Sequence, residues 1–334
     1  FGRTLGGLYG WNTLGAVAGS CAVELWWIRA LGVKGSTLAA VGCNLLAVLL
    51  AAASFRWLAP AAAEPAEAPQ ARTRPAVTLL LASFASGFAM LALEVIWLRF
   101  LTLFANDTDL AFTAVLGCVL FGVALGALLA SAWPGGSTRL SQLSAAFAAG
   151  CAALLVLGYR AEVAMIARSF RYDQDTVSLA LFLVLPGSVA SGVLCAALGA
   201  ALRERGQDGP GAAAQLSLWN TLGGVLGALT AGFVVLPVLG IERSVFAAAV
   251  LYAAIAIVLG SSQRAARRTE LTAVALGVLL LLAFPFGSLG PLFRSASVGR
   301  WMRPGDRVVA VAESGSATYS YVVHTKHGQP LFDQ

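Results

Sequence analysis

Apolar residues in this chain come in long runs that are separated by short groups of Gly, Pro or charged residues. An α-helix needs about 20 mostly apolar residues to cross roughly 30 Å of hydrocarbon, and most of the runs approach or exceed that length. The nine runs cover residues 5–28, 36–58, 76–104, 109–133, 142–158, 177–202, 213–236, 244–260 and 271–287. The pattern predicts an all-α polytopic membrane protein with about 8–9 transmembrane helices, of which the last is short.

Two connections between the runs are predicted to be long, and the chain changes character after the last run. Residues 59–75 form a polar linker rich in Ala, Pro and Glu, and residues 159–175 form the other long connection. Residues 307–312 and 317–323 alternate between polar and small or apolar types, which predicts a β-hairpin. A lone hairpin is only marginally stable, so we expect it to belong to a larger domain or to pack on a partner.

The composition supports a lipid bilayer as the main partner. Hydrophobic residues make up 58% of the chain and charged residues only 11%, against roughly 25% charged residues in an ordinary soluble domain. The net charge of +6 comes from basic residues that are spread over short loops and do not form one stripe, so no nucleic-acid partner is predicted.

The basic residues also predict an orientation. One set of loops and helix ends carries Arg3, Arg56, Arg72, Arg74, Arg139, Arg203, Arg205, Arg264, Arg267 and Arg268, and the alternate set carries the shorter list of Arg29, Lys34, Arg99, Arg160, Arg168, Arg171 and Arg243. The positive-inside rule places the first set, with linkers 59–75, 203–212 and 261–270, in the cytoplasm. If residues 271–287 span the membrane, the C-terminal tail lies on the other side.

An internal repeat is the most informative sequence feature. The sequence Trp-Asn-Thr-Leu-Gly begins at Trp11 and again at Trp219, and the register continues without a gap. The further matches pair Gly19 with Gly227, Leu31-Gly32 with Leu239-Gly240, Ser36 with Ser244 and Ala39-Ala40 with Ala247-Ala248. Because six predicted crossings separate the two copies, both run in the same direction, as in the parallel six-helix halves of major facilitator transporters.

This spacing predicts the domain organisation. Residues 1–58 supply the last two helices of a first repeat that is incomplete, since four helices are expected ahead of Phe1. Residues 59–75 are the linker and residues 76–260 the second six-helix repeat. Residues 261–290 hold a linker with a further helix, and residues 291–334 begin an extramembrane β-region.

Small and polar residues inside the runs are the candidate functional positions. Three Gly-x-x-x-Gly pairs predict close helix packing, namely Gly15 with Gly19, Gly122 with Gly126 and Gly223 with Gly227. The amides of Asn12 and Asn220 need partners in hydrocarbon, so they either bridge helices or line a shared central cavity.

Glu94 and Glu24 are the carboxylates deepest in apolar runs, and two roles are open to them. Intramembrane carboxylates mark ion or substrate pathways. However, Glu94 precedes Trp97 and Arg99, which are residue types that anchor a helix at the lipid headgroups, so an interfacial salt bridge is the alternative. His324 and His327 could supply half a metal site but have no Cys nearby, so no metal, cofactor or catalytic site is predicted.

Several of these segments resemble bacterial membrane proteins in which a facilitator-like bundle is fused to a spermidine synthase-like domain. The resemblance rests on Ser86-Gly87-Phe88-Ala89, Glu94-Val95-Ile96-Trp97-Leu98-Arg99, Gly122-Val123-Ala124-Leu125-Gly126 and the repeated Asn-Thr-Leu-Gly segments. Glu313-Ser314-Gly315-Ser316-Ala317-Thr318 is similar to the Glu-Gly-x-x-Ala-Thr stretch that opens the synthase domain. In the family a Gly-rich nucleotide-binding loop and amine-binding acidic residues would follow, and the chain contains neither.

The resemblance implies a multi-pass protein of the bacterial inner membrane. Three functional hypotheses are open. In the first, the chain is a non-catalytic scaffold or anchor, and transfer of an aminopropyl group from decarboxylated S-adenosylmethionine to putrescine belongs to a domain outside it. In the second, it transports a small cation such as a polyamine through a cavity lined by Asn12, Asn220 and Glu94. In the third, it is a structural subunit of a complex with other membrane subunits.

Overall fold

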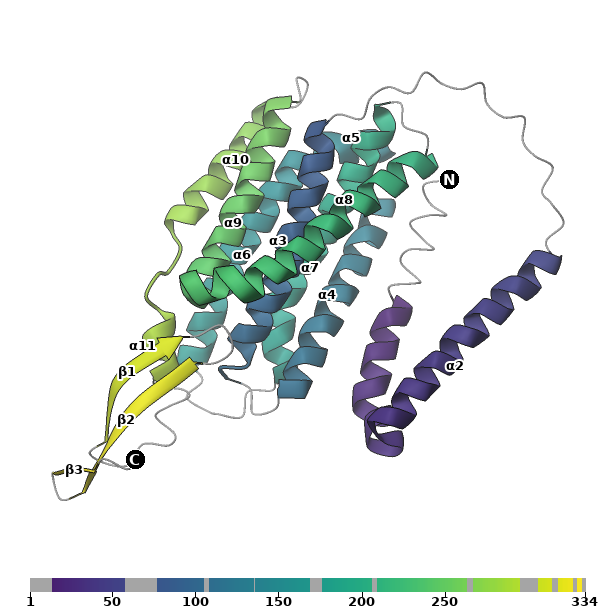
Figure 1. The fold of residues 1–334 in the computed structure, drawn as a ribbon. Helices are drawn as coiled ribbons and strands as arrows, with labels where there is room; N and C mark the ends of the chain where they lie inside the picture. The colour runs from purple at the N-terminus through teal and green to yellow at the C-terminus, as the bar shows by residue number, and fades with distance from the viewer. Residues whose placement is uncertain are drawn as a thin grey trace.

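The computed structural model is a helical bundle with a small β-sheet at one end (Figure 1). It describes residues 14–57, 77–104, 108–134, 136–168, 176–205, 209–262, 267–294, 306–313, 318–326 and 329–331. After helical residues 14–22, the helices are η1 (Val23–Trp27), α2 (Ile28–Trp57), α3 (Val77–Leu101), α4 (Thr108–Ser131), α5 (Gly136–Gln142), α6 (Ser144–Arg168), α7 (Thr176–Glu204), α8 (Gly209–Thr230), η2 (Ala231–Val235), α9 (Leu236–Ser262), α10 (Arg267–Leu282) and α11 (Leu289–Phe293).

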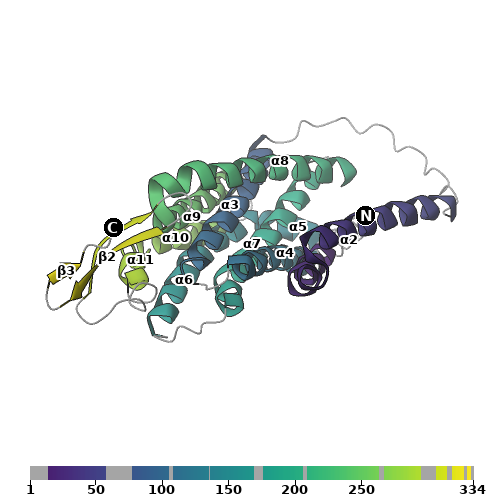
Figure 2. The ribbon, with the colours of Figure 1, turned by 60° about the horizontal axis from the view of Figure 1, so that its bottom comes forward.

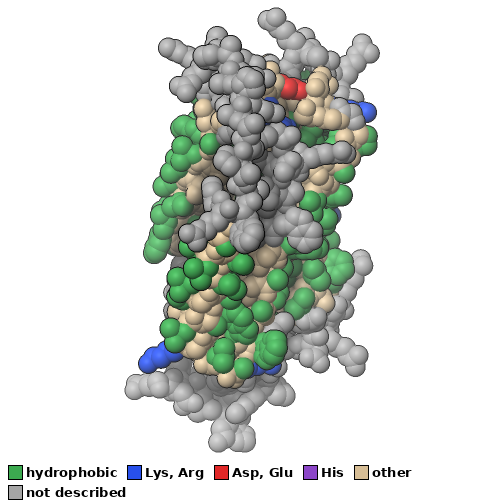
Figure 3. Space-filling view, turned by 90° about the vertical axis from the view of Figure 1, so that its right-hand side faces the viewer, with side chains coloured by type: hydrophobic (Ala, Val, Ile, Leu, Met, Phe, Trp, Pro, Cys, Tyr) green, Lys and Arg blue, Asp and Glu red, His purple; other side chains and the backbone are tan. Residues whose placement is uncertain are grey.

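The helices have the length and composition of membrane spans. Six described stretches can cross a bilayer on these grounds, namely Ile28–Ser54, Val77–Leu101, Asp109–Ser131, Ser144–Ala167, Thr176–Glu204 and Gly211–Ser261. The last of these is much longer than one span and reverses direction at Gly240. Figure 3 shows hydrophobic side chains over the length of one face and charged side chains toward its two ends. The chain is therefore an all-α polytopic membrane protein.

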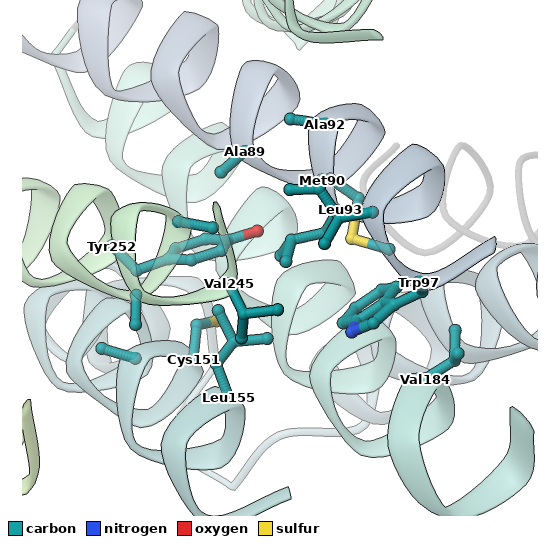
Figure 4. Packing of buried hydrophobic residues seen from close by; sticks show 14 of the residues in the cluster. Ala89, Met90, Ala92, Leu93, Trp97, Cys151, Leu155, Val184, Val245 and Tyr252 are labelled. Atoms are coloured by element: carbon teal, nitrogen blue, oxygen red, sulfur yellow. The ribbon is translucent and has the colours of Figure 1, made fainter. Parts of the chain in front are cut away.

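Helix α3 lies at the centre of the bundle and contacts α4, α7, α8 and α9. It is buried on most of its circumference, and its fully buried Trp97 and Phe100 belong to the main hydrophobic core together with Tyr159 of α6 and Tyr252 of α9. Figure 4 shows side chains of α3, α6, α7 and α9 meeting in this interior. The other close helix pair is α4 with α7.

The sequence repeat is also a repeat of backbone geometry. A π-helical turn at Val23–Trp27 recurs at Ala231–Val235, and the same offset of 208 residues relates the kinks at Gly32 and Gly240. The two glycines have nearly identical backbone angles, φ 67° and ψ 176° for Gly32 and φ 71° and ψ 176° for Gly240. At each kink a serine hydroxyl, Ser36 or Ser244, donates to the glycine carbonyl.

The two copies of the repeat have different surroundings. The second copy packs α8 on α3 and α9 on α6 and α3. The first copy, residues 14–57, lies at the edge of the bundle beside α4, which it contacts through η1 (Figures 1 and 2). Most large hydrophobic side chains of α2 are exposed in the structure, for example Leu38 and Leu49. The arrangement of the repeats as two facilitator-like halves, and the count of 8–9 spans, stay predictions.

The predicted β-hairpin is present. Strands β1 (Arg307–Glu313) and β2 (Thr318–Lys326) pair antiparallel from Arg307↔Val323 to Glu313↔Thr318, with an irregularity between Val308 and Ala310. A third strand, β3 (Gln329–Leu331), pairs antiparallel with the end of β2. The sheet lies next to α11, at the end of the bundle opposite the beginnings of α8 and α10 (Figure 1).

One predicted connection is wrong in part. The predicted connection over residues 159–175 begins where Arg160, Glu162 and Arg168 interrupt the apolar run, but α6 continues through these residues to Arg168. Two of these charged residues lie on different sides of the helix. Arg160 is on the exposed side, while Glu162 is on the buried side together with Tyr159 and Ile166. A charged residue thus marks the end of an apolar run without marking the end of the helix.

Candidate functional site

The carboxylate of Glu242 holds together three segments at the end of the bundle that carries the sheet. Glu242 follows the Gly240 kink, where α9 begins its return through the bundle. Its Oε2 accepts the backbone N–H of Gly287 at 2.8 Å, and its Oε1 accepts the backbone N–H groups of Ser288 at 3.0 Å and Leu289 at 3.2 Å. Tyr159 of α6 donates its hydroxyl to the same Oε1 at 3.2 Å.

These hydrogen bonds place a negative charge at the start of α11. Three successive backbone N–H groups converge on one carboxylate, and hydrogen bonds to a charged group are among the stronger ones in proteins. An anion is also favoured at the N-terminal end of a helix, where the backbone N–H groups lack intrahelical partners. Glu242 therefore fixes the turn between α10 and α11 against α6 and α9.

Aromatic rings reinforce the same junction. Tyr159 stacks on Phe284 with ring centroids 5.0 Å apart and an interplanar angle of 7°, and it meets Phe100 edge to face at 5.9 Å. Phe246 of α9 contacts both Phe284 and Phe286. The guanidinium of Arg160 donates to the carbonyl of Ala283 at 2.8 Å.

The sheet is connected to this junction through its first two strands. Val308 of β1 and Val322 of β2 pack against the main hydrophobic core, to which Leu289, Leu292 and Phe293 of α11 also belong. Asp306, just before β1, is buried. We call this set of contacts around Glu242, α11 and the first two strands the sheet junction.

The predicted candidates Asn220 and Glu94 both lie in the interior region around α3 but are not brought together. The space next to Gly87 of α3 is filled by Asn220, whose backbone carbonyl and side-chain Oδ1 would overlap any Cβ at Gly87. Glu94 is half-buried on α3, seven residues beyond Gly87, which is about 10 Å along a helix. The Trp97 side chain, considered above as an interfacial anchor, is only 1% exposed and lies in the core.

The remaining polar candidates lie apart from these. Asn12 is outside the described residues. Glu24 is half-buried in η1 of the first copy. His324 lies on β2, while His327 is outside the described residues.

The predicted packing glycines occupy two kinds of environment. Gly223 and Gly227 of α8 lie against the backbone carbonyls of Phe84 and Phe88, and Gly122 and Gly126 of α4 lie against Ser188 and Val189 of α7. A Cβ at any of these four positions would overlap the neighbouring helix. By contrast, a Cβ at Gly15 or Gly19 would meet no described atom within 4 Å.

Three polar groups in the bundle were not predicted. Besides Glu242, the Tyr252 hydroxyl of α9 lies 3.2 Å from the Ser191 hydroxyl of α7, with Ser86 of α3 as a further hydrogen-bond partner. The third is Glu162 of α6, whose side chain is 1% exposed. Glu162 lies in the predicted connection and Glu242 at the edge of an apolar run, so the sequence does not distinguish either residue from an ordinary charged loop residue. Nothing in the sequence around Tyr252 indicates that its hydroxyl has a buried partner.

No group of three or more His, Cys, Asp and Glu residues that could hold a metal ion occurs in the part of the chain that the structure describes. Comparison of the chain with protein-family models, with curated proteins and with solved structures finds no match.

Proposed function

We propose that this chain is a membrane scaffold whose helical bundle holds an extramembrane β-region at a fixed position. The observation that carries the proposal is the sheet junction: the Glu242 carboxylate accepts hydrogen bonds from three successive amides of the turn that leads to α11. The contacts of Val308 and Val322 with the bundle core support it, since a short sheet gains stability by packing on a larger body. The resemblance to membrane-fused spermidine synthase-like proteins suggests the class of domain to which such a region belongs.

Glu242→Gln tests the role of the sheet junction. The substitution keeps the size of the side chain but removes the charge and replaces one acceptor oxygen with a donor that opposes a backbone N–H. Hydrogen bonds to a charged group contribute about 1.5–3 kcal/mol, so we expect roughly tenfold or greater acceleration of amide hydrogen exchange in β1 and β2. Exchange in α3, which does not contact Glu242 through any described hydrogen bond, should not change.

Glu204→Gln is the matched control, because Glu204 is an exposed carboxylate at the end of α7. Amide hydrogens of the Glu204→Gln variant should exchange at wild-type rates in every helix and strand. Equal exchange of β1 and β2 in the wild type and Glu242→Gln would contradict the proposed holding function.

Two activity measurements on the purified chain separate scaffolding from the other hypotheses. Aminopropyl transfer from decarboxylated S-adenosylmethionine to putrescine by the chain alone would rule out a non-catalytic role. Uptake of putrescine or spermidine into proteoliposomes that is lost in Glu94→Gln and Asn220→Ala would favour the transporter hypothesis instead.

A further inference from the structure

Glu162 is a deeply buried carboxylate for which the scaffold function has no use. It lies on α6 within the candidate span Ser144–Ala167, and its side chain is 1% exposed. No described residue donates a hydrogen bond to its Oε1. Nearly all buried polar side-chain atoms in proteins have a hydrogen-bond partner, so such an atom requires a specific explanation.

The contrast with Glu242 shows that this end of the bundle can satisfy a carboxylate. Glu242 accepts three backbone N–H groups and the hydroxyl of Tyr159. Glu162 is three residues after Tyr159, on the next turn of the same buried side of α6. Arg160 does not neutralise it, because Arg160 is exposed and donates to the carbonyl of Ala283.

A cation would account for both the burial and the missing donor. An ionised carboxylate in an apolar interior is costly unless a positive charge accompanies it, and intramembrane carboxylates commonly mark ion sites. The neighbouring turn of α6 carries Tyr159, whose ring belongs to a cluster with Phe100 and Phe284. These rings contact one another and supply no positive charge to pair with Glu162.

We propose that Glu162 forms a binding site for a monovalent cation, either an alkali metal ion or the ammonium group of a small amine, in the interior of the bundle beside α6. The site does not depend on the proposed scaffold function. A cation site at Glu162 predicts that the free energy of unfolding depends on the concentration of the cation. The hydrogen bonds of Glu242 predict no such dependence.

The test is thermal unfolding of the full chain in detergent at constant ionic strength and pH, with choline chloride replaced stepwise by sodium chloride, potassium chloride or methylammonium chloride. A ligand at ten times its dissociation constant should raise the melting temperature by roughly 2 °C. Glu162→Gln should abolish this shift, and Glu162→Asp should keep it at a higher cation concentration. Glu204→Gln, which neutralises an exposed carboxylate, should keep the shift unchanged.

The outcomes separate the two cation sources. A saturable shift with sodium or potassium alone identifies an alkali ion site, and a shift with methylammonium alone identifies an ammonium site. Binding of the radiolabelled cation at about one per chain, lost in Glu162→Gln, should accompany either result. The proposal is overturned if no cation gives a saturable shift, or if the shift persists in Glu162→Gln.

Discussion

The close packing of α8 on α3 makes a sharp prediction about Gly223. An ideal Cβ at this position would lie 2.8 Å from the carbonyl carbon and 3.0 Å from the Cα of Phe84, and it would overlap the carbonyl oxygen. Because the obstacle is backbone, a side-chain rotation cannot relieve it and the two helices must move apart. Overpacking costs about 1–3 kcal/mol, and a rigid obstacle favours the upper end of that range.

The net effect of Gly223→Ala also includes helix propensity. Alanine stabilises a helix interior by about 1 kcal/mol relative to glycine, so the expected loss of stability is about 2 kcal/mol. Unfolding entropy is about 2.1 cal/mol/K per residue, so for 334 residues this loss corresponds to a fall in melting temperature of roughly 3 °C. Thermal unfolding in detergent, followed by tryptophan fluorescence or by size-exclusion chromatography of heated samples, measures it directly.

The repeat supplies a matched control. Gly15 is the equivalent of Gly223 in the first copy, and a Cβ there would meet no described atom within 4 Å. Gly15→Ala should therefore leave the melting temperature unchanged or raise it by roughly 1–2 °C through helix propensity. The reasoning fails if Gly223→Ala melts at or above the wild-type temperature, or if the two substitutions lower it equally.

Three further substitutions test other contacts by thermal unfolding. Gly240→Ala forces a side chain into a backbone conformation, φ 71° and ψ 176°, that essentially only glycine adopts, and it should cost about 1–3 kcal/mol; an unchanged melting temperature would show that the kink does not need this conformation. Tyr252→Phe removes the hydroxyl that contacts Ser191 and should cost about 1 kcal/mol. Tyr321→Phe, at an exposed position of β2, should be neutral, and equal effects of the two substitutions would argue against the buried contact. Trp97→Ala should cost about 3–5 kcal/mol because Trp97 is fully buried, while Trp26→Ala, at a position 71% exposed in the structure, should cost much less; the reverse order would contradict the core assignment.

Features that depend on neighbours along the chain were predictable. The length of the apolar runs predicted the membrane class, because crossing hydrocarbon requires a continuous apolar helix of fixed length. The repeat predicted a repeated helix, turn and helix, and the Leu-Gly pair shared by the two copies lies at equivalent kinks, Gly32 and Gly240. Alternation of residue types predicted β1 and β2.

Features that depend on which helices pair were not predictable. A helix of a soluble protein has an apolar side toward the core and a polar side toward water. In a membrane the lipid-facing and protein-facing sides are both apolar, so the periodicity of hydrophobic residues does not identify the buried side. The sequence treats Gly15 and Gly223 as equivalent, yet among the described residues only Gly223 of the two lies against another helix. The partners of Glu242 at residues 287–289 are 45–47 positions away, and nothing in the local pattern links them.

The sequence by itself therefore determined that the protein lies in a membrane, that a pair of helices joined by a turn is repeated, and that the tail forms a β-hairpin. Each of these follows from the hydrophobicity and backbone preference of contiguous residues. The tertiary structure decided which glycines carry helix contacts, that Glu242 joins the bundle to the sheet, and that Glu162 is enclosed with no described hydrogen-bond donor to its Oε1. These depend on helices meeting across the bundle, where small differences in packing select the partner and leave no periodic trace in the chain.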